Sequence, residues 1–237
     1  MLVAAAVCPC PPLLVPEVAA GAAPEMEAAR TACADALGVL AAARPDLLVV
    51  VGTAEEGGQG SFPQGTPGTF RGFGVDVDVR LGAAADAVPE RPLPVSLAVG
   101  GWLLERTRWA GAPVEGLGVA QTLAPQRCAE IGRELAGRAG RVALLVMGDG
   151  SACRTLKAPG YLDERAAPFD AEAARALGAA DLAALRALDP GLARELQAAG
   201  RAPWQVLAGA AESADLTGSL LYEDAPYGVC YLVATWS

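Results

Sequence analysis

Histidine is absent from this chain of 237 residues. Imidazole is the usual base of a catalytic serine and the commonest protein ligand for transition metals. Its absence therefore excludes a Ser-His-Asp triad and any metal site that depends on histidine. Lysine is nearly absent as well, because Lys157 is the only one and arginine supplies the other basic residues. Lys157 is a candidate cation for an anionic ligand, although an exposed surface lysine is the more common case.

Basic clusters and aromatic residues are also scarce. Eighteen Lys and Arg residues stand against 27 Asp and Glu residues, which gives a net charge of -9, and aromatic residues make up 5% of the chain. A duplex partner needs a basic stripe on the protein, and a single strand needs aromatic side chains on which its bases stack. The sequence has neither pattern, so we expect no nucleic-acid partner.

Long apolar runs are missing too, because none reaches the ~20 residues that a membrane-spanning helix needs. Residues 1–7 are apolar but lack the basic start of a signal peptide, and prolines interrupt the run from Pro9 onward. Six cysteines occur without CxxC pairs or regular spacing, so we expect most of them to be reduced and buried. These features predict a soluble, cytoplasmic protein with no membrane partner.

Three apolar runs have the composition of strands that are buried on both faces of a parallel sheet, namely 2–7, 47–51 and 141–147. Residues 114–120 predict a further strand, and the alternation of apolar and polar residues over 73–81 predicts a half-exposed strand near a sheet edge. Helical patterns predict helices from 24 to about 44 and over 94–109, 125–138, 170–188, 190–199 and 203–213. Residues 52–74, with eight glycines and little periodicity, predict a long loop.

This order of elements predicts an α/β fold with a single domain over 1–237. Its central sheet is expected to be mixed but mostly parallel, with helices on its faces. The last two strands, predicted over 218–222 and 228–235, are expected to form an antiparallel hairpin at the C-terminal end of the chain.

Ligands of open α/β sheets bind beyond the carboxyl ends of the strands, where loops and helix starts converge. That rule selects residues 8–12, 52–58 and 148–153. Together with the closing hairpin they offer a set of polar or nucleophilic side chains: Cys10, Thr53, Glu55, Glu56, Asp149, Ser151, Cys153, Tyr222, Glu223 and Asp224.

Each candidate also has a structural interpretation. Asp149 stands between two glycines after a buried strand, where it is either an acid/base group or a turn-forming residue that binds backbone amides. Cys10 is either a packed small side chain or a thiolate, and a thiolate requires a lowered pKa. Glu55 is either a ligand or a solvated loop carboxylate.

Four segments together resemble the class III extradiol (LigB-like) dioxygenases and the related Memo-like proteins. Residues 7–16 look like the first motif, a strand that ends in a Pro-His-Pro type turn, and Cys10 stands at the position of an iron-binding histidine. Residues 47–55 are similar to the second motif, with Ala54 or Glu55 in place of its histidine. Residues 146–153 look like the segment that bears the acid/base histidine, with Ala152 or Cys153 at that position, and 221–231 is similar to the closing strands.

The resemblance implies a family fold whose ferrous ion is held by two histidines and one carboxylate, with a further histidine that moves protons. None of these imidazoles is present in this chain. We therefore expect no Fe(II) site, no assigned metal ligand, no resident cofactor and no ordinary extradiol activity.

Three hypotheses follow. In the first, the chain is a divergent LigB-like domain that has lost the iron chemistry and binds a small molecule or a protein partner in the ancestral cleft. That cleft is formed by Cys10, Thr53, Glu55, Ser151, Lys157 and Glu223. In the second, the chain is an enzyme with a reorganised site, in which thiolate ligands would favour zinc over iron. The side chains that would bind the metal or transfer protons there are Cys10, Glu55, Asp149, Cys153 or Glu223, and Asp149 and Cys153 are the candidate catalytic residues. In the third, it is a structural subunit that forms a homodimer or joins a partner.

Overall fold

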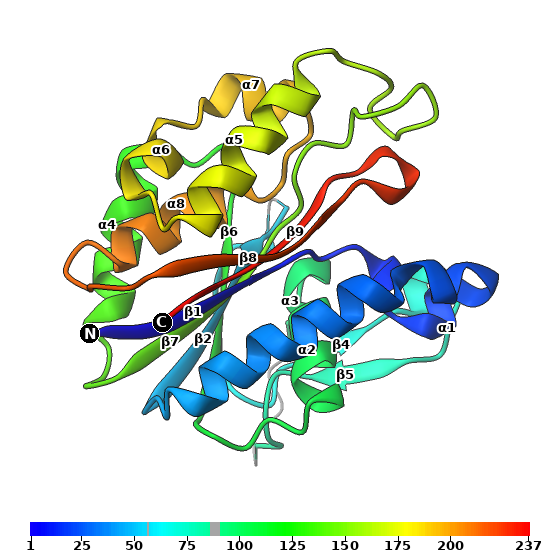
Figure 1. Ribbon diagram of the computed structural model, residues 1–237. Helices are drawn as coiled ribbons and strands as arrows, with labels where there is room; N and C mark the ends of the chain where they lie inside the picture. The colour runs from blue at the N-terminus through cyan, green and yellow to red at the C-terminus, as the bar shows by residue number, and fades with distance from the viewer. Residues whose placement is uncertain (56, 86–90) are drawn as a thin grey trace.

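A computed structural model describes residues 1–55, 57–85 and 91–237 (Figure 1). The candidate residue Glu56 lies outside the described residues. The main feature is a seven-stranded sheet with the order β3-β6-β2-β7-β1-β9-β8. The bounds of its strands are β1 (Leu2–Cys8), β2 (Leu47–Thr53), β3 (Gly60–Phe62), β6 (Val114–Val119), β7 (Val142–Met147), β8 (Gly218–Asp224) and β9 (Tyr231–Trp236).

The sheet is parallel in its centre and antiparallel at both edges. Strands β6, β2, β7 and β1 each run parallel to their neighbours in this group. Strand β3 pairs antiparallel with β6, β9 pairs antiparallel with β1, and β8 pairs antiparallel with β9. The structure thus confirms the predicted α/β fold class, a mostly parallel mixed sheet that ends in an antiparallel pair.

Helices cover both faces of this sheet (Figure 1). The helices are α1 (Pro16–Ala19), α2 (Glu27–Ala42), α3 (Val95–Arg106), α4 (Pro125–Ala136), α5 (Ala166–Gly178), α6 (Leu182–Ala187), α7 (Pro190–Glu195) and α8 (Arg201–Ala210). Helices α4 to α8 lie on one face. Helices α2 and α3 lie on the other, with a small two-stranded sheet formed by β4 (Pro67–Thr69) and β5 (Asp78–Arg80).

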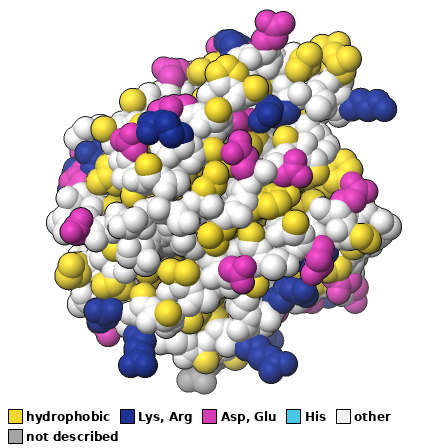
Figure 2. Space-filling model, viewed as in Figure 1, with side chains coloured by type: hydrophobic (Ala, Val, Ile, Leu, Met, Phe, Trp, Pro, Cys, Tyr) yellow, Lys and Arg dark blue, Asp and Glu magenta, His cyan; other side chains and the backbone are white. Residues whose placement is uncertain are grey.

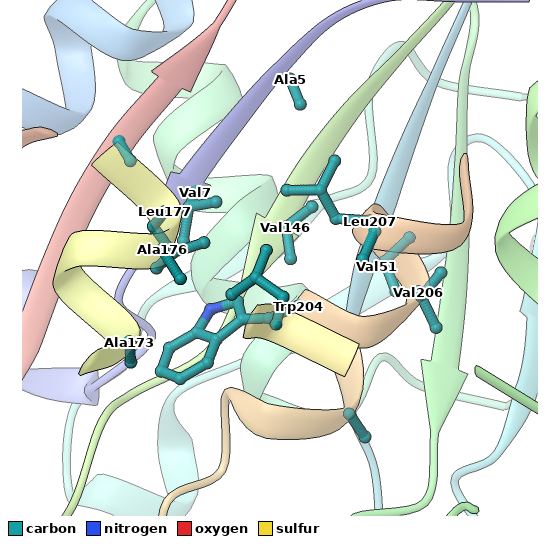
Figure 3. Packing of buried hydrophobic residues seen from close by; sticks show 14 of the residues in the cluster. Ala5, Val7, Val51, Val146, Ala173, Ala176, Leu177, Trp204, Val206 and Leu207 are labelled. Atoms are coloured by element: carbon teal, nitrogen blue, oxygen red, sulfur yellow. The ribbon is translucent and has the colours of Figure 1, made fainter. Parts of the chain in front are cut away.

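The alternation of side chains along each buried strand explains the two layers. In β7, Leu144 and Val146 belong to the core on the side of α4 to α8, whereas Leu145 and Met147 belong to the core on the side of α2 and α3. Trp204 of α8 is fully buried, and Figure 3 shows it packed among apolar side chains from the sheet and from α5. Every residue of β7 is buried, as the sequence predicted for the strand 141–147, and only Arg141 at its start is exposed and lies outside β7.

Two elements differ from the sequence-based expectation. The predicted strand 73–81 is wrong in extent and place, because only Asp78–Arg80 pairs, and it pairs with β4 outside the main sheet. Gly74 adopts a left-handed conformation (φ 82°) that ends the preceding 3₁₀ turn and separates it from the strand. The predicted loop 52–74 likewise contains the short strands β3 and β4.

The predicted helix 170–188 is also wrong, because it is two helices, α5 and α6, and the first begins earlier, at Ala166. Ala180 has a positive φ of 50°, which breaks a right-handed helix. The Asp181 side chain then accepts a hydrogen bond from Ala184 N at 3.0 Å and caps α6.

In the described part of the chain, no helix combines the length and the apolarity needed to cross a membrane. The six cysteines are all among the described residues, and all are buried and free of disulfide bonds, in agreement with the expectation from their spacing.

Candidate functional site

The carboxyl ends of three parallel strands lie next to one another. In the register of the sheet, Met147 of β7 is opposite Cys8 of β1 on one side and Gly52 of β2 on the other. The segments that follow these strands therefore leave the sheet from the same edge, which is where the sequence placed the candidate ligand-binding residues.

A hydrogen bond at this edge joins Cys10 and Asp149. The Cys10 backbone N–H donates a hydrogen bond to Asp149 Oδ1 at 2.8 Å, and the Cys10 Sγ lies 4.0 Å from Asp149 Oδ2. The Asp149 backbone oxygen accepts a hydrogen bond from Gly200 N at 2.7 Å, which ties the loop after β7 to the start of α8. The loop after β1 and the loop after β7 are thus joined through one carboxyl group.

The electrostatics of this pair favour its neutral form. Asp149 is half-buried, and desolvation by the surrounding protein raises its pKa to about 7, although the hydrogen bond from Cys10 N–H acts in the opposite direction. Burial, reinforced by the Asp149 charge, also raises the pKa of the Cys10 thiol and of the Tyr231 hydroxyl. Near neutral pH the Asp149 carboxyl therefore exists in both protonation states, beside a thiol and a phenol that keep their protons.

A second polar cluster surrounds Asp170, which is fully buried in α5. Its Oδ1 accepts a hydrogen bond from Ser151 N at 2.7 Å, and its Oδ2 accepts from Ser151 Oγ at 2.6 Å and from Arg154 Nη1 at 3.2 Å. Gly150 is required here because a Cβ at this position would lie 2.8 Å from Asp170 Oδ1. Arg154 balances the charge of Asp170, and the Ser151 hydroxyl is held as a donor to the carboxylate.

The remaining predicted residues are not gathered at the Cys10–Asp149 pair. The thiol of Cys153 is buried and points to the carbonyl oxygen of Leu196 at 3.5 Å, and burial raises its pKa. The backbone oxygen of Thr53 accepts a hydrogen bond from Ser96 Oγ at 2.6 Å. Glu55, Lys157, Glu223 and Asp224 are exposed, and Tyr222 is half-buried.

Sequence reasoning missed Asp170 and Arg154. A signal for Asp170 exists, because it lies on the apolar stripe of its helix, between Ala166 and Ala173, which are both buried. An acid at such a position needs a buried partner, and here the partners come from the loop after β7. Arg154 has no comparable signal, since nothing in the sequence indicates that it meets Asp170.

The residues do not fit the ferrous ion that the resemblance implies. Cys10 keeps its proton because its thiol pKa is raised, and Ala54 and Ala152 have no donor atom. Within residues 1–55, 57–85 and 91–237, no group of three Cys, Asp or Glu side chains is arranged to hold a metal ion.

Comparison with known proteins shows a similar fold but no family. No protein-family model matches the chain, and no curated protein matches it. Eighteen solved protein chains match in structure. One of them is the crystal structure of an uncharacterized protein from Escherichia coli K12, which is 13% identical, covers 99% of both chains and has a TM-score of 0.52. The chain thus has an α/β fold similar to that of this bacterial protein over its whole length.

Proposed function

We propose that this protein binds a small molecule at the carboxyl edge of its sheet, on a fold that resembles the extradiol dioxygenases but without their ferrous chemistry. The observation that supports the proposal is the Cys10–Asp149 contact, which joins two loops at the edge where ligands of such sheets bind. A half-buried carboxyl group at this edge is the kind of polar group that orients a ligand in an otherwise apolar site.

The protonation behaviour of Asp149 indicates what the ligand offers. With a pKa raised to about 7, the carboxyl donates a hydrogen bond when protonated and accepts one when ionised. Its Oδ1 is already used by Cys10 N–H. A ligand hydroxyl group, which both donates and accepts, therefore matches the remaining oxygen in either state.

The binding test compares the protein with its Asp149→Asn variant against a library of small hydroxylated compounds, with catechol as the first member. A ligand present at 100 times its dissociation constant should stabilise the protein by about 2.7 kcal/mol, which raises the unfolding midpoint by roughly 5–11 °C. The shift should shrink in Asp149→Asn and persist in Asp215→Asn, which alters an exposed acid before β8. An equal shift in all three proteins would place the ligand elsewhere and reject the proposed site.

The lack of ferrous chemistry is tested separately. Protein purified without a tag and then loaded with Fe(II) is mixed with catechol under oxygen, and ring cleavage is followed by absorbance. We expect no turnover, and less than about a tenth of an equivalent of iron or zinc by elemental analysis before loading. Rapid ring cleavage would overturn this part of the proposal.

A second candidate function is acid/base catalysis at the same place, because a carboxyl whose pKa lies near neutral pH is suited to proton transfer. In that case a compound from the library is converted and not only bound. Its rate would depend on a group that titrates near pH 7, and Asp149→Asn would abolish the rate. Product analysis by mass spectrometry distinguishes this function from binding alone.

A further inference from the structure

A groove of about 680 Å³ lies between the segment that follows β7 and the turn between β8 and β9. In Figure 1 the two segments project from the same end of the molecule and lie side by side. The groove is lined by Arg154, Thr155, Leu156, Lys157, Leu162, Ala225, Tyr227 and Gly228. Its volume is within the range of small-molecule sites, about 300–1,000 Å³.

The backbone fixes both walls of this groove. Arg154 N donates a hydrogen bond to the carbonyl oxygen of Gly228 at 3.0 Å. Gly228 has a φ of 77°, and a Cβ at this position would lie 2.5 Å from Ala158 Cβ and 2.6 Å from Thr155 Oγ1. The Tyr227 hydroxyl donates to Glu25 Oε2 at 2.6 Å, which anchors the turn to the segment before α2. Only a glycine allows the two walls to approach this closely.

The charge of the lining is opposite to that of the protein. The chain has a net charge of -9, yet none of the described residues that line the groove is acidic, and two are basic. Asp170 balances Arg154 through the 3.2 Å ion pair, so the net positive charge comes from Lys157, which is exposed. Asp163, which follows the lining residue Leu162, is paired with Arg165 at 2.6 Å.

The rest of the lining is apolar and exposed. In the part of the chain that the structure describes, eight large hydrophobic side chains are exposed, and three of them, Leu156, Leu162 and Tyr227, line this groove. Figure 2 shows hydrophobic side chains beside a basic one where the segment after β7 projects. A cluster of exposed apolar side chains around a cation marks a binding site more often than a random surface does.

We infer that this groove binds a small organic anion, an aromatic carboxylate. Its carboxylate lies at Lys157 and Arg154, and its ring packs against Leu156, Leu162 and Tyr227. The inference goes beyond the proposed function, because neither Cys10 nor Asp149 lines the groove.

The test uses 1-naphthoate as the anion and 1-naphthalenemethanol as its neutral counterpart, each titrated into the protein by calorimetry. We expect one naphthoate per chain, and binding of the alcohol that is weaker by roughly 5-fold. Lys157→Met should weaken naphthoate binding by roughly the same factor and leave the alcohol unchanged. Lys157→Arg should retain naphthoate binding. Because Lys157 is exposed, its substitution leaves the fold intact.

Arg108→Met is the matched control, because it removes the same charge at an exposed position in the turn between α3 and β6, outside the groove. It should bind naphthoate as the unaltered protein does. Equal losses in Lys157→Met and Arg108→Met would reduce the effect to net charge and overturn the inference. The inference would also be overturned if naphthoate did not bind at millimolar concentration, or if Asp149→Asn were the only variant that weakened naphthoate binding. That last outcome places the anion at the Cys10–Asp149 pair and supports the proposed function instead.

Discussion

Replacing Asp149 with asparagine should stabilise the protein, and the gain should grow with pH. Desolvation raises the pKa of this carboxyl from an ordinary value of 3.8 to about 7 in the folded state. Below about pH 4 both the folded and the unfolded chain hold the proton, so the carboxyl has no net effect. Between about pH 4 and pH 7 the unfolded chain releases the proton while the folded chain retains it, and the free energy of unfolding falls as the pH rises. Above about pH 7 the penalty is complete.

The size of the effect follows from the two pKa values. A difference of about three pKa units corresponds to about 4 kcal/mol, at about 1.4 kcal/mol per unit. The neutral amide of Asp149→Asn avoids this penalty and keeps an oxygen that accepts the hydrogen bond from Cys10 N–H. The variant should therefore gain up to about 2 kcal/mol at pH 5.5 and up to about 4 kcal/mol at pH 8.5. These are upper limits, because part of the Asp149 side chain meets solvent.

Urea denaturation at several pH values above the isoelectric point, which is about 4.6, measures this difference. Asp215→Asn is the control, because it removes an exposed carboxylate and should change stability little at any pH. For each variant, the free energy of unfolding of the unaltered protein at the same pH is subtracted, and this difference cancels the titration of all other groups. A gain for Asp149→Asn that is the same at pH 5.5 and pH 8.5 would refute the desolvation argument.

Three further predictions concern packing and buried polar groups. Asp170→Ala leaves the partners of a fully buried carboxylate unpaired and should lower the free energy of unfolding by about 3–5 kcal/mol. Ser151→Ala should lower it by only about 1–2 kcal/mol. Equal losses for the two variants in urea denaturation would contradict this difference. Gly132→Ala places a Cβ against the backbone of α8 and should cost about 1–3 kcal/mol, whereas Gly38→Ala in α2, where nothing lies within 4 Å, should gain about 0.5–1 kcal/mol. All six cysteines are buried, so a thiol reagent should label none of them rapidly in the folded protein and all of them in urea; fast labelling of the folded protein would show that a thiol is accessible.

The polar contacts at the carboxyl edge were predictable in part. The rule that loops converge beyond parallel strands selected both Cys10 and Asp149, and the structure joins them at 2.8 Å. The same rule selected Ser151 but did not provide its partner, since Asp170 is 19 residues farther along the chain, in helix α5. Pairing between distant segments depends on how a helix docks on the sheet, and local sequence patterns do not encode it.

The sequence by itself determined the central layer of this protein. Uninterrupted apolar runs such as 47–51 and 142–147 favour strands that are covered on both faces, as in a parallel sheet between two layers of helices. The lack of histidine, also visible at once, decided that no site in this chain uses imidazole as a base or a metal ligand.

Tertiary structure alone decided the protonation and the shape of the sites. The pKa of Asp149 depends on how much water the surrounding segments exclude, and the groove beside Lys157 exists because Gly228 allows a turn to approach the segment after β7. Desolvation and close approach are properties of atoms that are distant in sequence and near in space, so they appear only when the chain has folded.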